Sequence, residues 1–188
     1  MEKKNETLKN ISARFTCRDF KDTPVGDQQL DELVKAALAS PSAMNLQPWH
    51  VVFVTDKAVI DELDEEGMSI LSNSEDQSMY ERMMSRGGKL FYNAPCLAIV
   101  LSDDSKWGTL DSGILCQNVV IAAESMGLGT CIVGMAGVPL NGPNAAVFAK
   151  RFNFPKGSTF EIGILIGEIN SGKEPHEHDM SKVSFFPT

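Results

Sequence analysis

The pattern of apolar and polar positions along the chain changes its period several times, and each change marks an expected element. After Asp27, apolar residues recur at the three- and four-residue spacing of one helix face, and Pro41 ends the pattern. Short runs rich in β-branched residues instead predict buried strands. Strands are expected over residues 51–54, 94–101, 131–133 and 160–167, with an edge strand over 182–186. Helices are expected over residues 5–13, 27–40, 57–71, 77–86, 109–126 and 144–152.

Strands that alternate with helices indicate an α/β or α+β protein, in which helices cover the faces of a sheet. The helix over residues 109–126 has apolar or small residues on nearly all sides, so we expect it to be central. A chain of 188 residues is long enough for one domain with a full hydrophobic core. We therefore expect a single domain over residues 1–188.

Composition and charge narrow the function classes. Hydrophobic residues make up 43% of the chain and charged residues 22%, which is ordinary for a folded domain. The formal net charge of −8 repels phosphate backbones, so nucleic acid is not an expected partner. No stretch approaches the ~20 apolar residues of a membrane span, and no apolar run follows the N-terminal charges as in a signal peptide. Four cysteines without C-x-x-C spacing predict reduced thiols and a cytoplasmic protein.

Residues 40–50 (SPSAMNLQPWH) join a predicted helix to a predicted strand and have the composition of a binding loop. Two prolines restrict the backbone, small residues permit close approach, and the amides of Asn45 and Gln47 offer donors and acceptors to a planar polar partner. The alternative is an elaborate turn between the two elements, and the loop alone does not decide between these interpretations.

Residues 14–20 alternate in character, as expected for an extended segment. Arg14, Thr16 and Arg18 would then point to one side, and Phe15 and Cys17 to the other. Two guanidinium groups that flank a hydroxyl suit a phosphate monoester, because each can donate two hydrogen bonds to its oxygens. The alternative is a solvated surface segment whose arginines pair with nearby aspartates.

Motifs for nucleotide binding and nucleophilic catalysis are incomplete. The glycine-rich stretch that begins at Gly127 has Ile132 at the sixth fingerprint position, and a helix precedes it where a strand is required. Met135 stands where a P-loop needs lysine. His176 and His178 lie in a polar tail, where a solvated surface is favoured over a metal site, so no metal is expected. No serine lies in a G-x-S-x-G elbow, and no catalytic acid or base is assigned.

A protein without such machinery can use the chemistry of a cofactor, which it needs only to bind and tune. Flavin mononucleotide (FMN) suits the residues described above. Its phosphate matches the arginines, its polar pyrimidine edge matches the loop amides, and its flat ring can be approached closely by glycine backbone.

These residues resemble the motifs of the FMN-dependent nitroreductase superfamily in its short form. The similarity extends over essentially the whole chain, and its most specific part is residues 41–49. Residues 14–18 correspond to the family's R-R-S-x-R motif, residues 93–95 precede a strand, and residues 111–129 complete the pattern. The resemblance implies an α+β fold with a mixed, mostly antiparallel sheet covered by helices. It also implies an intertwined homodimer with two FMN sites at its interface.

The resemblance assigns residues to each FMN site. One subunit would hold the phosphate and ribityl chain through Arg14, Phe15, Thr16 and Arg18. The other subunit would surround the ring and its polar edge with Pro41, Ser42, Ala43, Asn45 and Gln47. The backbone of Ile132, Val133 and Gly134 would approach the flavin.

The chain departs from the family pattern at the phosphate site. Phe15 replaces the second arginine and Thr16 replaces the usual serine. A basic residue near the C-terminus often completes the site in the family, but residues 173–178 show no evident match to that position. His178 and Lys182 are the two candidates for that role.

The expected function is that of an NAD(P)H oxidoreductase, with ping-pong hydride transfer through flavin N5 to a nitroaromatic, quinone or similar small oxidant. Residues 65–92, whose pattern is the least regular, are expected to select the oxidant. Two alternatives stay open. One is a specialised reductase of the same fold that acts on an enone or a halogenated aromatic, and the other is a flavin-binding protein without catalysis.

Overall fold

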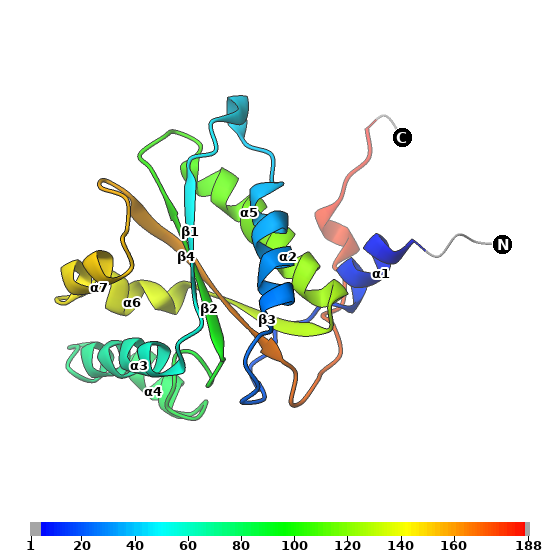
Figure 1. The fold of residues 1–188 in the computed structure, drawn as a ribbon. Coiled ribbons are helices and arrows are strands. Elements are labelled where there is room, and N and C mark those ends of the chain that lie inside the picture. The colour runs from blue at the N-terminus through cyan, green and yellow to red at the C-terminus, as the bar shows by residue number, and fades with distance from the viewer. Residues whose placement is uncertain (1–4, 187–188) are drawn as a thin grey trace.

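Two layers of helices enclose one four-stranded sheet in the computed structural model, which describes residues 5–186 (Figure 1). The strands are β1 (Trp49–Val54), β2 (Cys96–Ser102), β3 (Leu128–Val133) and β4 (Thr159–Glu168). They lie in the order β1-β2-β4-β3, and all three pairings are antiparallel. The α+β class with an antiparallel-rich sheet is therefore confirmed, and β1 and β3 are its two edges.

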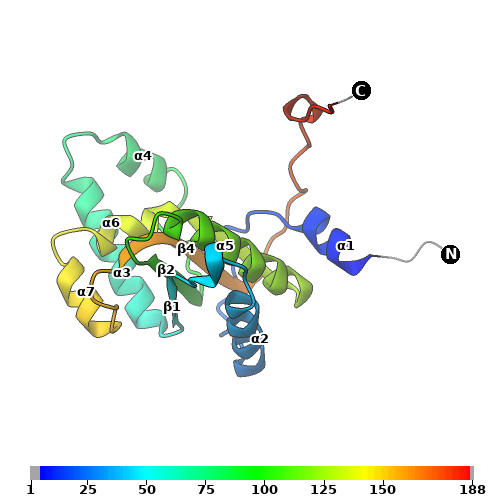
Figure 2. The ribbon, with the colours of Figure 1, turned by 90° about the horizontal axis from the view of Figure 1, so that it is seen from above.

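Alternation along β2 explains the two layers. Residues 96, 98 and 100 pack with α2 (Asp27–Leu38) and α5 (Gly108–Ser125), whereas residues 97, 99 and 101 belong to the core on the opposite face. The helices of that second face are α3 (Lys57–Ser72), α4 (Ser78–Met84), α6 (Gly137–Leu140) and α7 (Ala145–Arg151). Figures 1 and 2 show the two groups on opposite sides of the sheet, with α1 (Glu6–Ala13) standing beside α5.

Most predicted elements are present, with their ends shifted by up to three residues. The strand predicted over 131–133 begins earlier, at Leu128. The reason is that only Gly127, with a φ of 74°, takes the left-handed conformation that ends α5, whereas Gly129 lies within the strand. The hydrophobic pattern does not predict η2 (Gly134–Ala136) or α6, because three or four residues are too few to show a period.

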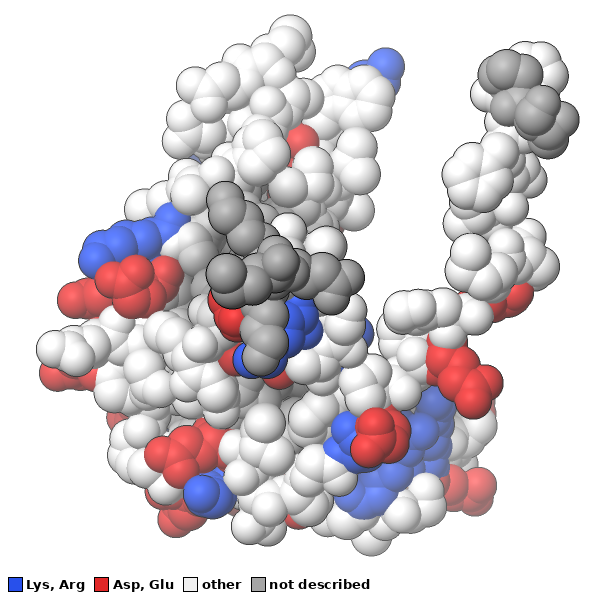
Figure 3. Space-filling view, turned by 90° about the vertical axis from the view of Figure 1, so that its right-hand side faces the viewer, with Lys and Arg blue, Asp and Glu red and all other residues white. Residues whose placement is uncertain are grey.

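The predicted edge strand over residues 182–186 is wrong for the single chain. Residues 174–186 form an exposed C-terminal arm whose one regular element is the short 3-10 helix η3 (Met180–Lys182). Figures 2 and 3 show the arm standing away from the body of the protein. Its large apolar side chains are exposed: Met180, Val183, Phe185 and Phe186. A strand needs the backbone of a neighbouring strand, and none lies beside the arm within residues 5–186.

Candidate functional site

Residues 14–20 run along the outer edge of β3. Thr16 forms an isolated parallel bridge with Thr130, and the Cys17 N–H donates to the Thr130 carbonyl oxygen over 2.9 Å. The Cys17 side chain is fully buried against Gly129, where an added Cβ would lie 2.9 Å from both Cβ and Sγ of Cys17. The missing side chain of Gly129 therefore lets this segment approach β3 as an additional edge.

A basic pocket, a cavity of about 170 Å³, lies beside this segment. It is lined by Phe15, Thr16, Arg18, Asp19, Ser171, Gly172 and Lys173. Thr16 and Arg18 share the pocket, as the alternation predicts, but Phe15 also lines it instead of pointing away with Cys17. Arg14 is not among the lining residues, contrary to the prediction that it shares one side with Thr16 and Arg18. It lies at the C-terminal end of α1, within electrostatic reach of Glu124.

Lys173 lines the basic pocket, although the sequence pattern did not single it out. Asp19 brings its stretch of chain to the pocket, since the carboxylate accepts from Asn170 Nδ2 at 3.0 Å and from Ser171 Oγ at 2.5 Å. The hydrogen bonds from Ser171 and Asn170 hold the pKa of the Asp19 carboxyl below its usual value, so it stays ionised at neutral pH. The two candidates from the sequence lie farther along the chain, in the exposed arm: His178 and Lys182.

Beyond Thr130, the edge of β3 is open. Ile132 is 44% exposed, and a Cβ at the exposed Gly134 would meet no atom within 4 Å. The Val133 side chain is buried, and strand alternation directs its own N–H and C=O groups toward β4. Alternate residues of a strand direct their N–H and C=O groups to the same side, so the Ile132 backbone faces the same edge as the Thr130 carbonyl. A flat molecule can therefore lie along this edge with its anionic end in the basic pocket.

The loop between α2 and β1 contains η1 (Ala43–Asn45) and holds three residues in the left-handed region. The φ angles of Met44, Asn45 and Gln47 are 53°, 55° and 49°. Residues other than glycine rarely adopt such φ values, and several such residues occur together only where surrounding contacts impose the conformation. The main contact is Asp111, which is buried on α5 and accepts the Ala43 N–H at 3.2 Å with each of its two carboxylate oxygens.

Three further polar contacts hold this loop. Asn118 of α5 donates through Nδ2 to Ser40 Oγ over 2.9 Å, and the Gln47 N–H donates to Ser42 Oγ, also over 2.9 Å. The Gln47 side-chain amide donates to Asn45 Oδ1 over 3.1 Å. Asp111 and Asn118 belong to the motif around residues 111–129, and the structure explains their presence as anchors of the loop.

The single chain does not bring the loop and the basic pocket together. In Figure 1 the loop projects at the top of the view, whereas the blue chain that follows α1 passes below the middle. The predicted residues therefore divide into two groups. The first follows β3 and includes Thr16, Arg18 and residues 132–134, and the second is the loop with Pro41, Ser42, Ala43, Asn45 and Gln47.

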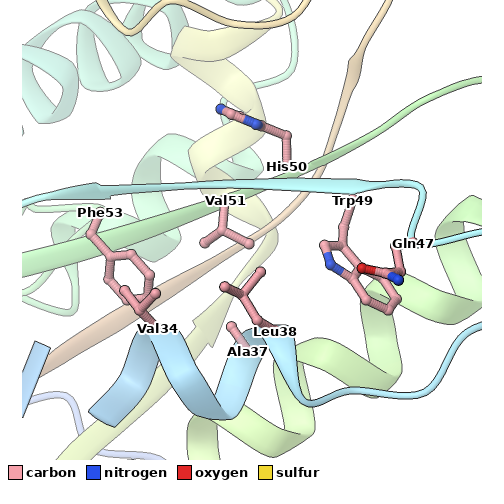
Figure 4. Close-up of a pocket in the computed structure, with 8 residues that line it drawn as sticks. All are labelled: Val34, Ala37, Leu38, Gln47, Trp49, His50, Val51 and Phe53. Carbon is pink, nitrogen blue, oxygen red and sulfur yellow. The ribbon is translucent and has the colours of Figure 1, made fainter. Parts of the chain in front are cut away.

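An apolar groove of about 330 Å³ lies between α2 and the edge strand β1 (Figure 4). Its lining residues are Val34, Ala37, Leu38, Gln47, Trp49, His50, Val51 and Phe53. Val34 and Leu38 are exposed on α2, and the Val51 and Phe53 side chains point toward that helix. An apolar surface beside an unpaired strand edge is a place where another segment of chain can bind.

The cysteines are poor candidates for a nucleophile. All four are free and buried, and burial raises the pKa of Cys96 to about 12 and that of Cys116 to about 11. Within residues 5–186, His, Cys, Asp and Glu side chains do not gather in threes as a metal site requires. No helix in the same residues combines the length and the apolar character needed to cross a membrane.

Comparison with known proteins gives a family and several relatives. The model of the nitroreductase family matches residues 11–167. The crystal structure of a nitroreductase with bound FMN from Desulfitobacterium hafniense DCB-2 is 41% identical, with a TM-score of 0.93 over 97% of this chain and 99% of that one. The NADPH-flavin oxidoreductase of Vibrio harveyi is 29% identical over 176 residues, which cover 90% of this chain and 68% of that protein. A protein of Methanothermobacter thermautotrophicus is 26% identical over 137 residues, which cover 70% of this chain and 62% of that protein.

Removal of the Asp111 carboxylate should release the loop. In Asp111→Ala the Ala43 N–H loses its acceptor, so we expect the amides of residues 42–47 to exchange with deuterium about tenfold faster or more. The control is Asp104→Ala, which removes an exposed acid just before α5. Equal exchange in the two variants would contradict the anchoring role of Asp111.

Proposed function

The chain belongs to the nitroreductase family, and on that basis we propose that it is a single-domain, FMN-dependent NAD(P)H oxidoreductase. The observation that carries the proposal is a basic pocket beside the segment that pairs with the outer edge of β3, in a chain 41% identical to a nitroreductase with bound FMN. The NADPH named for the Vibrio harveyi relative supports a reduced nicotinamide as the electron donor. When bound, FMN would supply the redox chemistry, taking hydride from NAD(P)H at N5 and passing it to a nitroaromatic, quinone or similar oxidant in ping-pong order.

The basic pocket fits the phosphate of FMN. Arg18 and Lys173 bring two positive charges, and Thr16 a hydroxyl, to one small cavity in a chain with a formal net charge of −8. Arginine donates paired hydrogen bonds to phosphate oxygens, and lysine adds a compact charge. Figure 3 shows Lys and Arg side chains gathered near the base of the arm, beside acidic ones. Arg14, at the end of α1, would approach this site from outside the pocket.

The open edge of β3 fits the flat ring. The Ile132 backbone faces this edge, and the space beside Gly134 lets a planar group lie close to the main chain. Backbone N–H groups there can donate to polar ring atoms without moving, which is the electrostatic part of the protein's task. We assign no side chain as catalytic acid or base.

We propose that two copies of the chain form an intertwined homodimer that shares two FMN sites. The single chain holds the loop, with Asn45 and Gln47, away from the basic pocket. The left-handed conformation of the loop is already held by α5 of the same chain. The loop therefore has its binding conformation before it meets a flavin bound to the other copy. A second copy would place this loop over the ring bound at the first copy's β3.

The C-terminal arm supports the same assembly. Its apolar residues are exposed, and the sequence of 182–186 is strand-like. β1 has an unpaired edge, and the groove beside it is apolar. We propose that residues 182–186 of one copy pair with β1 of the other and place apolar side chains over that groove. The predicted edge strand would then exist in the dimer.

The other proposed partners are small molecules. Residues 65–92, which include the end of α3 and all of α4, are the proposed region for selection of the oxidant. The four reduced cysteines support a cytoplasmic location, where thiols stay reduced.

Anaerobic absorbance spectroscopy tests the function directly. The purified protein, reconstituted with FMN, should show a flavin band near roughly 450 nm that bleaches on addition of NADH or NADPH and returns when a quinone is added. A protein that cannot bind FMN refutes the flavin assignment. A bound flavin that stays oxidised with both nicotinamides favours a flavin-binding protein without catalysis.

The Arg14→Ala/Arg18→Ala double variant tests the phosphate assignment. Loss of charge-assisted hydrogen bonds should weaken FMN binding by about tenfold or more, measured by fluorescence titration. The matched control is Lys9→Ala/Lys35→Ala, which removes two exposed cations from α1 and α2. Wild-type FMN affinity in the arginine variant would contradict the assignment.

A further inference from the structure

The chain that leads from α4 into β2 contains two successive left-handed residues. Tyr92 has a φ of 51° and Asn93 a φ of 58°. Asparagine tolerates this conformation, but a bulky aromatic residue rarely adopts it. Such an outlier persists only where its surroundings impose it, and it is a reason to look for a function.

A buried carboxylate imposes the conformation. Asp64 of α3 is only 4% exposed, and its Oδ1 accepts the Leu90 N–H at 2.5 Å and the Phe91 N–H at 3.2 Å. The side chains of Leu90 and Phe91 are buried. Leu90 Cδ1 fills the space that a side chain on Gly67 of α3 would need. The backbone of Leu90 and Phe91, which leads directly into Tyr92, is therefore held in place.

The residue after the outlier pair closes the turn. The Ala94 N–H donates to the Phe91 carbonyl oxygen over 2.9 Å, and Ala94 is itself fully buried. Tyr92 is thus held between two anchored stretches of chain. Its ring packs partly against the core on the α3 side of the sheet.

The result of this arrangement is a contact between Tyr92 and Arg18. The Arg18 guanidinium lies over the tyrosine ring, 5.9 Å from its centroid. A cation–π contact of this kind uses the charge of the guanidinium and leaves its N–H donors available for hydrogen bonds. The carboxylate next to Arg18 in the chain, that of Asp19, is occupied by Asn170 and Ser171. Arg18 can therefore direct its donors into the basic pocket.

We propose that Tyr92, held in its strained conformation by Asp64, is a positioning residue that orients Arg18 toward the phosphate of FMN. This inference rests on the proposed function. Arg18 and Lys173 are the cations that line the pocket, and Phe15 stands where the family has its second arginine. The orientation of the single guanidinium of Arg18 therefore has a large share in phosphate binding.

The test compares the affinities for FMN and riboflavin, which differ by the phosphate. Tyr92→Leu should lower the FMN affinity by about 2- to 30-fold and leave the riboflavin affinity within about twofold. Tyr92→Phe keeps the ring and should match the wild type. Tyr92→Asn suits the left-handed backbone, so it should fold and still lose FMN affinity as Tyr92→Leu does.

A double-mutant cycle shows whether Tyr92 acts through Arg18. In an Arg18→Ala background, Tyr92→Leu should change the FMN affinity by less than about twofold. Equal loss of FMN and riboflavin, an undiminished effect without Arg18, or a Tyr92→Phe variant as weak as Tyr92→Leu would each overturn the inference. A wild-type protein that binds no FMN would instead refute the proposed function, so the two failures are distinguishable.

Discussion

The candidate site depends on one close backbone contact, in which the Cys17 N–H donates to the Thr130 carbonyl oxygen across the outer edge of β3. The contact exists because Gly129 has no side chain at the point where Cys17 is buried. It places Thr16 and Arg18 at one end of an otherwise open strand edge. The pairing of this segment with β3 ends at Thr130, so the backbone from Ile132 onward stays accessible. The pairing at Thr130 therefore determines both where the candidate site lies and how much of the β3 edge is open to a ligand.

The two edges of the sheet have different tasks. At β3, the chain would supply charge and an open backbone to the proposed ligand, whereas β1 is left with an unpaired edge and an apolar groove beside it within residues 5–186. The loop that ends at β1 is anchored by Asp111 and Asn118 of the long central helix α5. The helix α5 thus fixes the loop that we propose to reach the FMN site of the neighbouring copy. The same helix is buried against one face of the sheet. Dimer assembly and cofactor binding would then depend on the same elements.

Much of the fold follows from local patterns. The single apolar stripe of α2, the uniform apolar character of α5 and the β-branched runs of the strands each identify an element without knowledge of the rest. The sequence also marks the arginine segment and the loop as candidates, because their residue types suit a phosphate and a planar polar group, and their roles stay predictions.

Features set by distant contacts were not predictable. Lys173 reaches the basic pocket through hydrogen bonds between Asp19 and Asn170, which lie 151 residues apart in sequence. The left-handed conformation of Tyr92 is not marked by a glycine, since it depends on Asp64 of α3, which anchors the backbone just before it. The strand-like residues 182–186 have no neighbouring strand within residues 5–186. In each case the sequence contains the residues but not the geometry that joins them.

A mixed-dimer experiment tests the central claim, that each site combines β3 of one copy with the loop of the other. Copies with Arg14→Ala/Arg18→Ala and copies with Asn45→Ala/Gln47→Ala are given different tags, mixed as dimers and purified through both tags. If the sites are shared, one site of each mixed dimer is intact and the other carries both defects, so the mixed dimer should bind one FMN with wild-type affinity. If each site belongs to a single chain, both sites are damaged, and a mixed dimer that binds FMN no better than the two parent variants would contradict the account.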